Sequence, residues 1–184
     1  MFDACVLYPA SVRDVLMRLA CTGAFRARWT QQIHDEWIRN LLANRPDLTR
    51  AQLELTATRM NAAVDDALVA GYEPLIDGIQ GLPDADDRHV VASAIRCGAS
   101  VIVTYNLKDF PESSLARWGL EAQHPDEFAE NVFDLQRGQF LGALHGMRRA
   151  LKSPPLSVEE FLDVLRRAGL KQLVKRLGGY KSVL

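Results

Sequence analysis

The sequence predicts an α/β protein, a parallel sheet flanked by helices, with a helical C-terminal extension. Two apolar runs, at residues 2–8 and 100–105, alternate with segments whose apolar residues recur at helical spacing, which is typical of parallel sheets. Beyond residue 125 only helical patterns follow. The chain has 184 residues, of which 48% are hydrophobic, enough to bury a core. We therefore expect two parts, residues 1–125 and 126–184.

The first part begins with a predicted strand and two helices. The run "FDACVLY" (2–8) indicates a short buried strand. The segment 11–23 carries an apolar stripe at helical spacing and ends at a glycine, a common helix stop. A second helix is expected over residues 30–46, with Thr30 as its cap and Pro46 at its end.

A third helix begins with a capping box. Thr49 and Gln52 form this box, and the helical pattern extends toward Val69. The following "YEPLI" (72–76) favours a strand or an extended link. A loop then leads into a helix over about residues 86–98, which ends at a glycine.

The clearest strand signal is "SVIVTY" (100–105), which is β-branched and apolar, as a central parallel strand requires. A short helix at 113–119 and a short strand at 120–123 follow. In the extension, Ser157 and Glu160 form another capping box. The final "GGYKSVL" is expected to be loose.

Composition indicates a protein of the cytoplasm that is not associated with a membrane. No apolar run approaches the ~20 residues that a membrane helix needs, and no secretory signal is visible. The three cysteines, Cys5, Cys21 and Cys97, lack the spacing of a zinc site. We expect them to be reduced thiols.

Charge is distributed unevenly, although the net charge is only −1. Residues 1–136 hold 12 Lys and Arg against 20 Asp and Glu, whereas residues 137–184 hold 10 against 3. The end of the chain is therefore basic, which suggests a charged partner for it.

Several acidic residues can reach one place in such a fold, because ligands of parallel α/β sheets bind at the carboxyl ends of the strands. These residues follow a strand or open a helix, and they are Asp3, Asp84, Asp86, Asp87 and Asp109. Asp86 or Asp87 alone could instead cap a helix, and Asp109 could form a turn. Asp3 is the hardest to explain otherwise, since a carboxylate at the head of a core strand is costly to bury unless it is paired or bound to a metal.

Glu36 is a further candidate. On a helix it falls about 60° from Ile33, at the border of the apolar stripe, from which a carboxylate can point toward the strand ends. The alternative is a surface acid that pairs with Arg39 or Asn40.

Gathered together, these acids would repel one another and raise each other's pKa, and a divalent cation would relieve that repulsion. Mg²⁺ and Mn²⁺ prefer oxygen ligands. Such a site lowers the pKa of water and stabilises charge on phosphate oxygens, as metal-assisted hydrolysis of a phosphodiester requires.

The motifs "DACVLYP", "EWIRNL", "LPDADDRHVVASAI" and "VIVTYNLKDFP", in this order and spacing, resemble the PIN-domain ribonucleases, and in particular VapC-type toxins of bacterial toxin–antitoxin pairs. The resemblance covers about residues 1–125. It implies a PIN nuclease domain there, a Mg²⁺- or Mn²⁺-dependent endoribonuclease activity, a cognate antitoxin and a homodimer.

The resemblance also implies roles for individual residues. Asp3, Glu36 and Asp87 match the acids of the family's metal site, with Asp84 and Asp86 as nearby supplements. Thr104 matches the hydroxyl beside the site. Many relatives carry an aspartate where this chain has Asn106; Asp109 is expected to supply the fourth charge, as a metal ligand and catalytic residue.

Two other functions stay open at this point. A receiver-type phosphoacceptor domain also has acids at strand ends, with Thr104 and Lys108 nearby, but it needs paired acids after its first strand, which are not found here. A non-catalytic PIN-like module that binds RNA or protein is favoured by Asn106, which cannot offer a full negative charge.

For the extension, we expect contacts with RNA phosphates, because lysine and arginine supply most non-specific affinity for nucleic acids. The candidates are Arg148, Arg149, Lys152, Arg166, Arg167, Lys171, Lys175 and Arg176. A solvated helical surface, or a dock for an acidic antitoxin segment, is the alternative.

Overall fold

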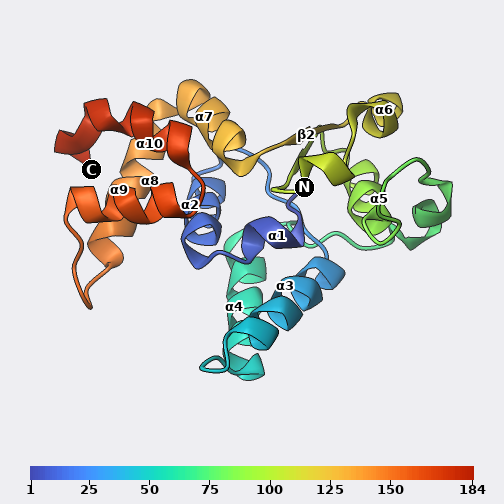
Figure 1. Ribbon diagram of the computed structural model, residues 1–184, viewed down its shortest axis with the longest axis horizontal. Coiled ribbons are helices and arrows are strands. Elements are labelled where there is room, and N and C mark those ends of the chain that lie inside the picture. The colour runs from blue at the N-terminus through green and yellow to red at the C-terminus, as the bar shows by residue number, and fades with distance from the viewer. The chain divides into compact units, whose positions relative to one another are not determined.

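The computed structural model describes residues 1–184, and the chain divides into two units (Figure 1). The first comprises Met1–Tyr8 and Ala27–His124, and the second comprises Pro9–Arg26 and Pro125–Leu184. None of the helices combines the length and the apolar character needed to cross a membrane.

The first unit combines helices with short extended segments. Its elements, in chain order, are α1 (Ala4–Leu7), α3 (Gln31–Asn44), α4 (Arg50–Ala63), a 3₁₀ helix (Glu73–Gly78), α5 (Arg88–Arg96), β1 (Val101–Val103), a 3₁₀ turn (Leu107–Asp109), α6 (Glu112–Leu115), a 3₁₀ turn (Ala116–Trp118) and β2 (Glu121–Gln123).

A parallel pair of strands lies at the centre of this unit. β1 pairs with β2 in a register that sets Val101 opposite Glu121. Along its other edge, β1 forms a parallel bridge from Val103 to Phe2. β1 therefore has a partner on both sides, as predicted for the apolar run at 100–105.

The row of extended segments continues beyond Phe2. The Phe2 amide donates to the carbonyl of Arg28 at 2.9 Å, and the next residue, Trp29, forms a parallel bridge with Leu68. Five short segments thus follow one another by hydrogen bonding, although only two are long enough to count as strands. The predicted α/β class with a parallel sheet is confirmed.

The predicted first strand is wrong beyond its opening residues. Asp3 has extended backbone, with φ −81° and ψ 155°, and α1 begins at the next residue. Ala4, Val6 and Leu7 are buried within this helix. A short continuous apolar run does not distinguish a buried strand from a buried helical turn, because both bury every side chain. Asp3 therefore stands where the extended segment ends.

Two predicted helix caps are confirmed. The Thr30 hydroxyl accepts a hydrogen bond from the Ile33 amide at the start of α3, at 3.1 Å. Thr49 and Gln52 form the reciprocal capping box of α4. Each cap satisfies backbone amides that the first turn of a helix leaves without a partner.

Two predicted boundaries are wrong. α4 ends at Ala63 instead of extending toward Val69, because Val64 is already extended and Leu68 joins the row of strand segments. The predicted strand or link at 72–76 is a 3₁₀ helix, Glu73–Gly78, with a proline in its first turn, where a missing amide hydrogen has no cost.

The second unit is helical throughout, as predicted for the extension. It consists of α2 (Ala10–Cys21), α7 (Pro125–Leu135), α8 (Arg137–Ala150), α9 (Val158–Arg167), α10 (Lys171–Leu177) and a final 3₁₀ helix (Gly178–Val183). The Ser157–Glu160 capping box opens α9, as predicted.

α2 belongs to this second unit although it lies early in the chain. Its residues Val12, Val15, Leu16 and Leu19 are buried, and it packs against α8 and α9. The predicted division into residues 1–125 and 126–184 places α2 in the first part of the chain and not with the extension. The boundary at residue 125 stays a prediction.

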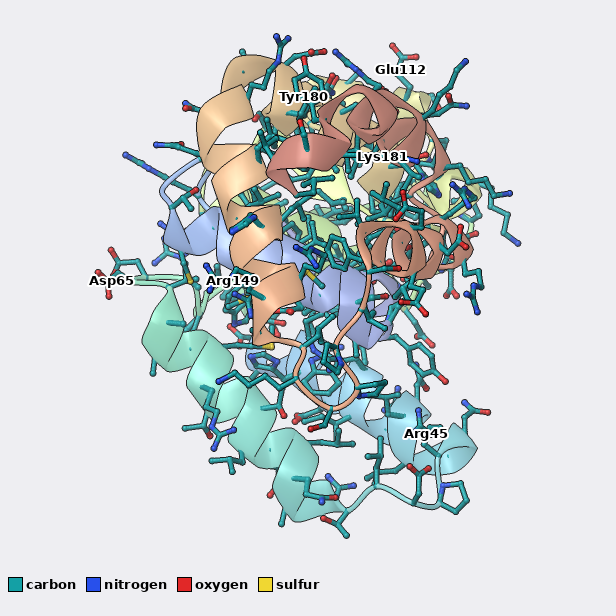
Figure 2. All side chains as sticks on the ribbon, turned by 90° about the vertical axis from the view of Figure 1, so that its left-hand side faces the viewer. Arg45, Asp65, Glu112, Arg149, Tyr180 and Lys181 are labelled. Atoms are coloured by element: carbon teal, nitrogen blue, oxygen red, sulfur yellow. The ribbon has the colours of Figure 1, made fainter.

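The end of the chain is ordered, so the predicted loose tail is wrong. Leu184 is buried, and its carbonyl oxygen accepts a hydrogen bond from Arg148 Nε at 2.7 Å. Arg148 also donates to the carbonyl of Leu156 at 3.0 Å. Tyr180, labelled in Figure 2, packs edge-on against Phe133. This segment is therefore held by the burial of its apolar side chains and by the Arg148 guanidinium, which donates two hydrogen bonds.

A buried carboxylate joins α7 to α10. Asp126 is 7% exposed, and its two oxygens accept hydrogen bonds from the amides of Gln172 at 2.8 Å and Leu173 at 3.0 Å. These amides lie in the first turn of α10, where a negative charge is favourable. Asp126 thus caps a helix that is distant from it in sequence.

Replacing Asp126 with asparagine is expected to lower the free energy of unfolding by about 2 kcal/mol. Asparagine keeps one acceptor oxygen, but its amide group would face a backbone donor. Chemical denaturation measures the change, with Glu127→Gln as control, because Glu127 is an exposed neighbour in α7. Equal stability of the two variants would contradict the capping role.

Candidate active site

An acidic pocket of about 480 Å³ opens in the first unit. Five carboxylates line it: Asp3, Glu36, Asp84, Asp86 and Asp87. The other residues on its wall are Ala4, Cys5, Gln32, Arg39, Asn40, His89 and Asn106. These side chains come from the end of the first extended segment, from α1, from α3, from the loop before α5 and its first turn, and from the loop after β1. Acids that are far apart in the sequence therefore share one wall.

Asp3 is buried, and only one of its two carboxylate oxygens accepts hydrogen bonds. Its Oδ2 accepts hydrogen bonds from the Thr104 hydroxyl at 2.6 Å and from the Cys5 thiol at 2.9 Å, whereas its Oδ1 has no hydrogen bond. Thr104 is fully buried directly after β1 and also accepts from the Asn106 amide at 3.0 Å. One oxygen of Asp3 is thus oriented, and the other is left for a ligand.

Cys5 is a thiol within this network. Besides its bond to Asp3, its sulfur accepts from the Tyr105 amide at 3.2 Å. Burial, together with the neighbouring Asp3 carboxylate, raises the pKa of the Cys5 thiol to about 12. Cys5 is therefore a protonated donor at neutral pH, and not a thiolate nucleophile.

Glu36 points from α3 toward α5. Its Oε1 lies 3.0 Å from His89 Nε2 and accepts from Gln32 Nε2 at 3.3 Å. The alternative expectation, pairing with Arg39 or Asn40, is wrong. A buried imidazole on another helix fixes the direction of this carboxylate, and its Oε2 has no hydrogen bond.

Asp87 precedes α5 without capping it through its side chain, so the capping interpretation of this residue is wrong. Burial and the charges of Asp3, Asp84 and Asp109 raise its pKa to about 7. These carboxylates are therefore close enough to repel one another, as expected of a gathered acidic site.

The remaining predicted residues are Asp84, Asp86, Asn106 and Asp109. Asp84 Oδ1 accepts from the Asp86 amide at 2.9 Å, and both residues are exposed. Asn106 lines the pocket, whereas Asp109 does not. The role of Asp109 as a fourth ligand stays a prediction, supported by its effect on the pKa of Asp87.

Residues 1–108 of the chain match the family model described as "PIN domain". The chain belongs to the PIN-domain family. The resemblance drawn from the motifs is thereby confirmed, and the receiver-type alternative has no remaining support. Residues 125–179 of this PIN-domain chain match a second family model, described as "VapC50 C-terminal domain".

A curated relative points in the same direction. The protein named "Putative ribonuclease VapC50", from Mycobacterium tuberculosis, is 38% identical over 99 residues. The aligned region makes up 54% of this chain and 57% of that protein, so the chain spans little more than half of its relative. No solved structure matches the chain significantly.

The donors of the PIN-domain pocket fit a divalent cation in their chemistry. They are carboxylate oxygens, which Mg²⁺ and Mn²⁺ prefer, and Asp3 keeps one oxygen without a hydrogen bond. The repulsion felt by Asp87 is what a cation would relieve. As the side chains stand, no three Asp, Glu, His or Cys groups are arranged to hold an ion.

The raised pKa of Asp87 predicts a pH dependence of stability. Because its pKa is about 7 in the folded chain and 3.8 as a reference, its stabilising effect is present below the reference value and is lost as the pH rises through about 7. Asp87→Asn should therefore stabilise the metal-free protein at pH about 8, by about 1–2 kcal/mol after allowance for solvent screening, and much less at pH about 4.

Thermal unfolding in EDTA at both pH values measures this effect, with the exposed Asp65→Asn as control. Added Mn²⁺ should then stabilise the wild type more than Asp87→Asn, because only the wild type gains from neutralised repulsion. A destabilised Asp87→Asn protein at the higher pH would contradict the electrostatic interpretation.

Sequence reasoning missed two residues that orient the acids, Cys5 and His89. Neither had a usable signal, since a cysteine beside an aspartate and a histidine in an apolar helix are both common in cores. By contrast, Gln32 lies four residues before Glu36, and this helical spacing could have placed it on the same face, as it did Arg39 and Asn40.

Proposed function

We propose that this chain is a metal-dependent endoribonuclease that hydrolyses RNA phosphodiester bonds and acts as the toxin of a toxin–antitoxin pair. The observation that carries the proposal is the acidic pocket, in which Asp3, Glu36 and Asp87 gather in a PIN domain. Such a concentration of carboxylates is unfavourable without a cation, and a protein keeps it where the cation serves chemistry.

In this proposal, Asp3 and Asp87 would hold a Mg²⁺ or Mn²⁺ ion, supplemented by Asp109. When bound, the ion stabilises charge on the phosphate oxygens and makes water more acidic. Thr104 and Cys5 keep the free Oδ1 of Asp3 directed at the pocket.

Glu36 has a separate role in the mechanism. His89 and Gln32 hold its Oε1, so the free Oε2 can accept a proton from the attacking water. This arrangement orients a general base without consuming its second oxygen.

The second unit is proposed to bind RNA through its basic residues. Three of the eight candidates are engaged within the chain: Arg148 with two carbonyls, Arg166 with Asp163, and Arg176 with Asp134. The remaining five, Arg149, Lys152, Arg167, Lys171 and Lys175, are exposed and have no ion pair. Arg149 is labelled in Figure 2.

An antitoxin and a second copy of the chain are the other proposed partners.

A second candidate is a non-catalytic module that binds RNA. Asn106 on the pocket wall and the lack of a ready set of three ligands favour it. The purified full chain, incubated with single-stranded RNA and Mn²⁺, separates the two functions. A nuclease should yield fragments that EDTA suppresses. Binding without fragments, at any Mn²⁺ or Mg²⁺ concentration, would leave the binding module as the function.

A further inference from the structure

Arg39 is the single lysine or arginine on the wall of the acidic pocket, where five carboxylates accompany it. Nevertheless it forms no ion pair and no hydrogen bond in the structure. Other arginines of this unit do pair, such as Arg45 with Asp47 at 2.7 Å. A guanidinium is charged at every physiological pH, so Arg39 is an exposed cation on the wall of an acidic pocket, and its donors have no partner within the chain.

The position of Arg39 follows from helical spacing along α3. Gln32, Glu36, Arg39 and Asn40 all line the pocket, and residues three or four apart share one face of a helix. Gln32 donates to Glu36 and accepts from the Tyr72 hydroxyl, so these three side chains already have hydrogen-bond partners within the chain. The side chains of Arg39 and Asn40, further along the same face, remain available to a ligand.

We propose that Arg39 binds a phosphate of the RNA backbone at the mouth of the pocket, with the Asn40 amide beside it. The inference rests on the proposed function. An RNA phosphate is repelled by the carboxylates, and a bound cation offsets only part of their charge. A guanidinium offers two parallel N–H donors that match phosphate oxygens. Since Arg39 has no internal partner, binding a phosphate breaks no existing contact.

RNA binding by the full chain in EDTA tests this role, because the RNA stays intact there. The probe is a fluorescein-labelled single-stranded oligoribonucleotide, followed by anisotropy at several salt concentrations. Arg39→Gln should raise the Kd about tenfold or more and reduce the slope of log affinity against log salt by about 0.7. Arg39→Lys should restore the slope but only part of the affinity, since it keeps the charge without the planar fork.

Arg59→Gln is the matched control. Arg59 is an exposed arginine on α4, has no partner and lies outside the pocket, so its loss removes the same charge from the same unit. It should leave both affinity and slope unchanged. Arg39→Gln with the affinity and slope of Arg59→Gln would overturn the inference.

Cleavage in Mn²⁺ separates this inference from the proposed function. A nuclease that uses Arg39 for binding should show a larger rise in KM than loss of kcat in Arg39→Gln. If the wild type binds RNA in an Arg39-dependent way but cuts none, the nuclease proposal fails and phosphate binding by Arg39 stands. If the wild type cuts RNA and Arg39→Gln has the same KM and Kd, Arg39 is not a phosphate contact.

Discussion

Replacing Asp3 with asparagine is expected to reduce RNA cleavage at least about 100-fold while the chain stays folded. Thr104 and Cys5 both donate to Asp3 Oδ2, and Oδ1 is free. Asparagine keeps the shape of the side chain but removes the negative charge that would hold a cation. Cleavage of single-stranded RNA in Mn²⁺ measures the loss, and calorimetric Mn²⁺ titration should show weaker binding.

Asp65→Asn is the control for this prediction, because Asp65, labelled in Figure 2, is exposed and lies outside the pocket. Asp3 is buried, so thermal unfolding must first show that Asp3→Asn is folded. Glu36→Gln gives an independent check at a less buried position, and its cleavage should also be lost. A folded Asp3→Asn protein with wild-type cleavage would remove Asp3 from the site.

Neutralising the unpaired cations of the second unit is expected to weaken RNA binding about 100-fold and to flatten its salt dependence. Arg149, Lys152, Arg167, Lys171 and Lys175 would all be changed to glutamine. Each residue that contacts a phosphate should contribute about 0.7 to the salt slope. Anisotropy with single-stranded RNA in EDTA measures both quantities.

Substitution is preferable to truncation of the extension, because α2 packs against α8 and α9 and would be left with an exposed apolar face. Arg50→Gln combined with Arg59→Gln controls for loss of positive charge on exposed helical surface. If the five-residue variant keeps the wild-type slope of log affinity against log salt, these five residues do not contact RNA. An interaction with an acidic antitoxin segment would then be the better explanation.

Much of the local structure could be predicted because it depends on near neighbours. The caps at Thr30, Thr49 and Ser157 follow from a side-chain acceptor placed before an apolar helical pattern, and these contacts span three residues. The β-branched residues of β1 likewise favour a strand by their own propensity. The acids were found through their order along the chain, since strand ends and helix starts are readable from pattern.

The first strand and the end of α4 could not be predicted, because local pattern leaves them ambiguous. An apolar run such as Ala4–Leu7 is compatible with a buried strand or a buried helical turn. Which one forms depends on what covers it. The same holds for Val64 and Leu68, where pairing with Trp29 replaces the last turns of a helix.

By itself, the sequence determined the family, the class of fold and the five acids that line the pocket, because motifs and periodicity are properties of the chain. Only the tertiary structure decided how those acids are held. Thr104 reaches Asp3 across a sequence separation of 101 residues, His89 fixes Glu36 from another helix, and Asp126 caps α10 from α7. These contacts depend on the packing of distant segments, which local propensity does not encode.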